Sequence, residues 1–163
     1  MVAFTGIELL DWVEETSRRW KSLIAAHPEI LSFECDIRET RDLAQLLQHI
    51  VAVEMRYAQR LAGIPETGYE AIPYDTAAEL FAAHQAAMQI FRTQLAESED
   101  WERTMDFKTI SMGVLRTSRK TMFFHALLHS MRHYAQLGTL VRQHGFKVPF
   151  PMDYLIMGAT RVE

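Results

Sequence analysis

Cysteine is almost absent from this sequence, since Cys35 is the only one among 163 residues. A single cysteine excludes a framework of disulfide bonds within the chain. It also excludes a zinc site built from several thiolates.

An excess of positive charge is missing as well. The chain has 17 Lys and Arg against 21 Asp and Glu, which gives a formal net charge of −4. No basic patch of the kind that binds phosphate backbones is present. The composition therefore argues against a nucleic-acid partner.

Long hydrophobic runs are the third absence, and none is long enough to span a bilayer. The first four residues carry no basic group and are soon followed by Glu8 and Asp11, so they do not resemble a secretory signal. Hydrophobic residues still make up 48% of the chain, enough for one domain over residues 1–163 with its own core. We expect a cytoplasmic domain without a membrane partner.

Start signals and apolar spacing predict four long helices. Three of them open on a cap residue with an acid three positions later, a spacing that lets each side chain bind the other's backbone N–H: Thr5 with Glu8, Asp36 with Glu39, and Thr76 with Glu79. The predicted helices cover residues 5–26, 36–61, 76–96 and 118–144, and Gly63 and Gly145 stop the second and the fourth.

The stretch before the last helix has weaker helical spacing. The alternating pattern of residues around Met112 and Gly113 suggests a short hairpin or an irregular extended segment. The tail after Gly145 is apolar enough that we expect it to pack along the other helices. With no convincing sheet, the pattern predicts an all-α four-helix bundle.

Three histidines stand four residues apart in the last predicted helix, at His125, His129 and His133. This spacing places them on one face, with successive Cα atoms roughly 6 Å apart along the axis. Two such imidazoles can reach one metal ion, and His49 in another helix can supply a third. Three imidazoles would leave a position open, as in reactive rather than structural sites. A solvated histidine face, or buried histidines that are only hydrogen-bonded, is the alternative.

The surroundings of these histidines limit the chemistry. Zinc peptidases carry a glutamate beside the first histidine of the pair, whereas here the neighbours are Ala126 and Ser130. On the second helix, Glu54 projects away from the face of His49. A metal deprotonates a bound thiol by itself, so the missing base harms thiol transfer less than peptide hydrolysis.

Three segments resemble the DinB/YfiT-like superfamily. Residues 125–137 are similar to its last-helix signature, His-x3-His-x3-His-x2-Gln-Leu, and residues 42–50 to its second-helix segment with one histidine. Residues 142–153 fit its usual ending. The likeness spans essentially the whole chain.

The resemblance implies that His49, His129 and His133 bind one divalent metal, commonly zinc or nickel, with water completing the shell. It also implies up-down-down-up connectivity and a homodimer. Some members of the superfamily are transferases or isomerases that depend on low-molecular-weight thiols. His125 matches a recurrent position that is not a ligand, so we assign it a role in the pocket.

Two further side chains are candidates for roles near the metal. Gln136 can orient a ligand imidazole, as metal sites usually require. Arg56, about two turns from His49, can pair with a carboxylate of a substrate or thiol. An ordinary glutamine and a solvated arginine are the competing interpretations.

Three function hypotheses follow. The first is a metal-dependent enzyme that transfers a small thiol to an electrophile, with metal-assisted hydrolysis second within that class. The second is a non-catalytic bundle that binds a metal or ligand, as in a stress response. The third is a bundle whose histidines serve packing alone.

Overall fold

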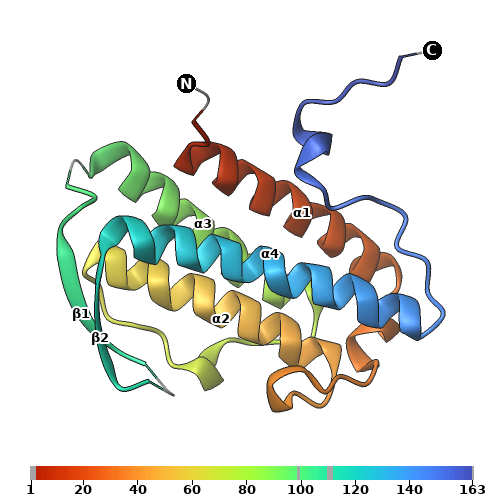
Figure 1. The fold of residues 1–163 in the computed structure, drawn as a ribbon. Helices are drawn as coiled ribbons and strands as arrows, with labels where there is room; N and C mark the ends of the chain where they lie inside the picture. The colour runs from red at the N-terminus through yellow and green to blue at the C-terminus, as the bar shows by residue number, and fades with distance from the viewer. Residues whose placement is uncertain (1–2, 99, 110–111, 163) are drawn as a thin grey trace.

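The computed structural model describes residues 3–98, 100–109 and 112–162. Its four long helices are α1 (Gly6–Ala26), α2 (Leu43–Ala62), α3 (Ala77–Glu97) and α4 (Arg119–Gln143). Strands β1 (Thr104–Lys108) and β2 (Val114–Ser118) form an antiparallel hairpin before α4 (Figure 1). The predicted all-α bundle with a hairpin excursion is therefore confirmed.

The helices do not simply alternate in direction. In Figure 1, α1 and α4 run one way, whereas α2 and α3 both run the other way. Because α2 and α3 are parallel, residues 63–76 must return along the bundle, with a 3₁₀ turn at Tyr69–Ala71. This crossing connection brings Tyr69 alongside α2.

Most of the predicted helix ends are observed. Thr5 and Glu8 form a complete capping box, and Thr76 accepts a hydrogen bond from the backbone N–H of Glu79. Gly63 and Gly145 follow α2 and α4 with φ of 68° and 79°, the left-handed conformation that glycine adopts at low cost.

The predicted start of the second helix was wrong. Asp36 makes no capping bond, and residues Ile37–Glu39 form only a 3₁₀ turn. Arg38 and Glu39 have φ of 54° and 62°, which an α-helix cannot contain. The cap is Asp42, whose carboxylate accepts the N–H of Gln45 at 2.9 Å. The helix thus begins at Leu43, and Arg38 and Glu39 lie exposed in the turn before it.

The hairpin lies against α2. Its register pairs Thr104 with Ser118 and Lys108 with Val114. The ring of Phe107 approaches that of Tyr57 on α2, with centroids 6.0 Å apart. The hairpin therefore packs on one end of α2.

The last helix is enclosed on most of its circumference, as predicted. Its apolar face is buried through Phe123, Leu127, Tyr134 and Val141. His129 and His133, on the other side of the helix, are buried too. The histidine face of α4 is therefore covered by protein, chiefly by its neighbour α2.

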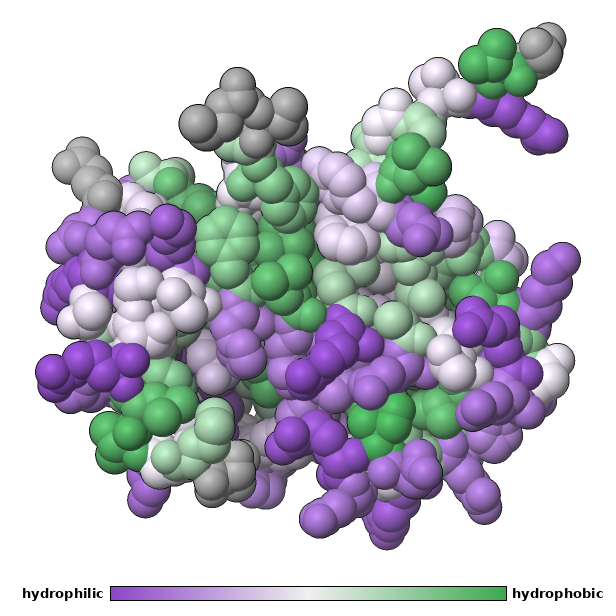
Figure 2. All heavy atoms as spheres, viewed as in Figure 1, coloured by the Kyte–Doolittle hydropathy of each residue, from purple (hydrophilic) through white to green (hydrophobic). Residues whose placement is uncertain are grey.

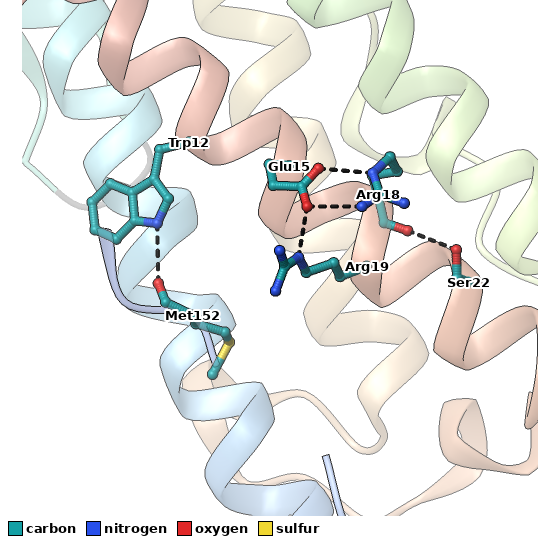
Figure 3. A network of polar contacts seen from close by, with 6 residues as sticks. All are labelled: Trp12, Glu15, Arg18, Arg19, Ser22 and Met152. Carbon is teal, nitrogen blue, oxygen red and sulfur yellow. Dashed lines mark hydrogen bonds and ion pairs between the residues drawn. The ribbon is translucent and has the colours of Figure 1, made fainter. Parts of the chain in front are cut away.

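The C-terminal tail packs along the bundle, as predicted. The indole N–H of Trp12 on α1 donates to the carbonyl oxygen of Met152 at 3.0 Å (Figure 3). Phe150 meets the ring of Trp20 edge to face. On the outer side of α1, Glu15 accepts hydrogen bonds from Arg18 and Arg19 (Figure 3).

The surface is mixed in polarity. Figure 2 shows hydrophilic side chains over the lower part of this face, around α2, and hydrophobic ones near the N-terminus and the C-terminal segment. Phe4 and Tyr154 contact each other there and remain partly exposed. In the described part of the chain, the helices are all too short or too polar to cross a bilayer.

Candidate metal centre

The site lies between α2 and α4, which run side by side (Figure 1). His49 stands in the second turn of α2, and His129 and His133 are one turn apart on α4. The four-residue spacing aligns the two α4 imidazoles with the axis, and α2 presents His49 to both. Helices α2 and α4 thus bring together the three histidines that the sequence analysis proposed as metal ligands.

The three rings are close enough to share one ion. Nε2 of His49 lies 3.1 Å from Nε2 of His129, and the three candidate ligand atoms all lie within 4.8 Å of one another. Nitrogens bound tetrahedrally to zinc at about 2.0–2.1 Å would be roughly 3.3 Å apart. The arrangement fits a metal ion with small adjustments of the side chains.

All three imidazoles are buried and hard to protonate. Burial lowers the pKa of His49 and His133 to about 4 and that of His129 to about 2. The mutual repulsion of these groups and the charge of Arg132 act in the same direction. The histidines are therefore neutral at pH 7, the state in which imidazole binds metals.

The polar atoms around the histidines also fit a metal better than a packing role. Buried imidazoles that serve only packing are expected to have hydrogen-bond partners. Nδ1 of His129 and Nδ1 of His133 are buried, and no described residue pairs with either atom. Nε2 of His49 and Nε2 of His129 can form one hydrogen bond, in which one ring donates and the other accepts. At least Nδ1 of His129 therefore lacks the hydrogen-bond partner that a packing role would require.

The other nominated residues lie around this cluster. His125 is exposed on α4, one turn before His129, and lines the same cavity. Arg56 also lines it but is held by Glu66, with Nε 3.0 Å from Oε2. The Oε1 atom of Gln136 is buried without a described partner, and the Gln136 side chain raises the pKa of His133 against the stronger effect of burial.

A cavity of about 660 Å³ opens in front of two of the histidines. It is lined by His49 and His129, whereas His133 lies deeper and is only 1% exposed. The remaining walls come from α2, α4, the hairpin and the two 3₁₀ turns. Sequence reasoning missed many of these lining residues: Arg38, Tyr57, Arg60, Tyr69, Lys108, Thr109 and Met112.

Sequence reasoning also missed a buried polar network beside the site. Glu54 does project away from His49, but into the core, where it is fully buried. Its carboxylate contacts Nδ1 of His84 at 2.7 Å and accepts a hydrogen bond from Ser130 at 2.7 Å. The only sequence signal was a glutamate within the apolar surroundings of α2. Because Glu54 is engaged on the far side of the helix, it does not serve the three histidines as a base.

The comparisons with known proteins agree with this picture. The sequence model of the DinB family matches residues 1–159. No curated protein matches the sequence. A match over nearly the whole length, together with the four-helix fold and the histidine cluster, leads to one conclusion. The chain belongs to the DinB family.

Proposed function

We propose that the protein holds one divalent metal ion, zinc or nickel, through His49, His129 and His133. The observation that carries this proposal is the convergence of three neutral, buried imidazoles from two helices. Three protein ligands leave a coordination position open, and two of the histidines face the cavity. The site is thus suited to bring a small molecule to the metal.

We further propose that Gln136 orients His133. The Gln136 amide oxygen and Nδ1 of His133 are both buried without other described partners and lie one turn apart on α4. An N–H at Nδ1 that donates to this oxygen leaves Nε2 as the acceptor atom, which lies 3.2 Å from the Arg132 guanidinium and would bind a metal once Arg132 moves aside. In this proposal, His125 contacts the bound molecule and not the metal.

The reaction that we favour is transfer of a low-molecular-weight thiol to an electrophile. A divalent cation at this site would lower the pKa of a thiol that reaches it, so that the thiolate forms near neutral pH. The sulfur then forms a bond to the electrophilic carbon, the leaving group departs with its bonding electrons, and the thiol proton passes to solvent. No described carboxylate stands at the histidine cluster to act as a general base, which favours this reaction over hydrolysis.

Elemental analysis of protein purified without a histidine tag tests the metal site. We expect one divalent ion per chain in the wild type and almost none in His129→Ala. His125→Ala, on the same face of α4, is the matched control and should keep its metal. A wild type that contains no metal and takes none up would reject the proposal and favour histidines that serve packing alone.

Turnover with a panel of thiols and electrophiles tests the reaction. Thiol consumption should require the metal, and a metal-stripped sample should regain activity when the ion returns. Full activity of the stripped protein would contradict the mechanism. Bound metal without turnover on any pair would favour a non-catalytic binding protein. The homodimer implied by the family resemblance remains a proposal, which sedimentation can test.

A further inference from the structure

The cavity in front of the histidines is strongly cationic. Five of its lining side chains are basic: Arg38, Arg56, Arg60, Lys108 and Arg132. None of its described lining residues is an aspartate or glutamate. The chain as a whole carries a net charge of −4, so this concentration of positive charge does not follow from composition.

Two of these cations share one counter-ion. Glu66, just outside the lining, binds Arg56 at 3.0 Å and Arg60 at 2.6 Å. Arg38, Lys108 and Arg132 have no carboxylate within ion-pair distance among the described residues. At least three positive charges therefore face the cavity without a counter-ion from the protein.

These free cations surround the histidine cluster. Arg132 donates towards Nε2 of His133 at 3.2 Å, and its charge helps to lower the pKa of His49 and His129 after the larger effect of burial. Arg38, in the 3₁₀ turn before α2, acts on His49 in the same way. Arg38 sits at a left-handed φ of 54°, an unfavourable conformation for arginine that is more common at functional positions.

We infer that the cavity binds a small molecule that carries at least two anionic groups, carboxylate or phosphate, and that Arg38 and Lys108 bind those groups. The inference rests on the proposed function, because the ligand would be the thiol or its acceptor. The volume of the cavity is within the range of pockets for small molecules, and Tyr57 and Tyr69 give the cavity partly apolar walls. The cations line a cavity and not an extended surface, which favours a small anion over a nucleic acid.

Calorimetry with tricarballylate, a small tricarboxylate, tests the inference on metal-free and zinc-loaded protein. We expect saturable binding in both, weakened by added salt, and no binding of the neutral trimethyl ester. The double variant Arg38→Gln/Lys108→Gln should bind roughly tenfold more weakly or worse. Both side chains are exposed, so the fold should be retained. Arg142→Gln, an exposed arginine at the far end of α4, is the control and should bind normally.

A second test uses a variant that should bind tricarballylate more tightly than the wild type. Glu66→Gln removes the carboxylate that holds Arg56 and Arg60, so it should strengthen tricarballylate binding. Equal binding of the ester, or unchanged affinity in the double variant, would overturn the inference. Tighter binding to a DNA duplex than to tricarballylate, lost in the same variant, would instead favour a nucleic-acid partner. Anion binding without metal uptake would refute the metal proposal alone, and metal uptake without anion binding would refute the inference alone.

Discussion

At the scale of single residues, the decisive property of the three histidines is that they stay neutral in the folded chain. Burial, and then the surrounding positive charges, lower their pKa values. A surface histidine would be half protonated near pH 6.5. These three therefore remain available to a cation at mildly acidic pH.

The same shifts predict how the stability of the metal-free protein depends on pH. Above pH 6.5 the histidines are neutral in both the folded and the unfolded state. Below that pH the unfolded chain takes up protons, while folded His49 and His133 resist until about pH 4. The free energy of unfolding should therefore fall between pH 7 and pH 5, by up to about 2 kcal/mol for each histidine.

Urea denaturation of metal-free protein at the two pH values measures this fall. His129→Ala should lose less stability than the wild type over the interval. Leu128→Ala, which changes an exposed side chain of α4 that does not titrate, should match the wild type. An identical decrease in the free energy of unfolding in the wild type and in His129→Ala would contradict the buried environment assigned to His129.

Gln136 provides a second prediction at this scale. If its amide oxygen accepts the N–H of His133, Gln136→Leu should weaken metal binding by about 10–100-fold, as is usual for such partners. Gln136→Glu keeps an acceptor and should retain most of the affinity. Competition with a chromophoric chelator measures both variants. Equal affinity in Gln136→Leu and the wild type would remove Gln136 from the site.

At the scale of helices and strands, local signals predicted most of the fold. The caps at Thr5 and Thr76 and the stop at Gly145 act within one helical turn, so the sequence nearby is sufficient to find them. The start of α2 was misplaced because Asp36 and Asp42 are both good caps. The left-handed backbone at Arg38, which decides between them, leaves no clear pattern in the sequence.

The network of Glu54, His84 and Ser130 joins α2, α3 and α4, and it predicts a coupled loss of stability. Glu54→Ala leaves the buried His84 without its partner, and should cost about 3 kcal/mol or more. His84→Ala should also destabilise the protein, because Glu54 then loses its closest partner. The double variant should lose clearly less than the sum, because the second change removes a group that is already unpaired.

Chemical denaturation of the two single variants and the double variant measures this cycle. Strict additivity would show that Glu54 and His84 do not interact across the helices. Metal content provides a second readout, since the network lies outside the histidine cluster. Variants that still fold should keep their metal.

At the scale of the whole molecule, the histidine cluster was predictable but its cavity was not. His129 and His133 are four residues apart, His49 lies in another predicted helix, and the resemblance to the DinB/YfiT-like superfamily implied that all three bind one ion. The cationic walls come from segments far apart in the chain, including Arg38 in a turn and Lys108 in the hairpin. No local spacing links such residues, so only the packing of the hairpin on α2 brings them together.

Metal binding should also stabilise the molecule as a whole. An ion that binds only the folded state adds about 2.7 kcal/mol at a hundredfold excess over its Kd. For a chain of this size, that corresponds to a rise in Tm of about 5–10 °C. Thermal unfolding with and without zinc should show this rise in the wild type and in His125→Ala. The same rise in His49→Ala would place the ion elsewhere.

X-ray absorption spectroscopy of the zinc-loaded, tag-free protein tests the central claim most directly. We expect three imidazole nitrogens at about 2.0–2.1 Å from a single ion, with one further light-atom ligand that exchanges when a thiol is added. Sulfur from Cys35 in the resting spectrum, fewer than three imidazoles, or a spectrum unchanged in His129→Ala would contradict the account.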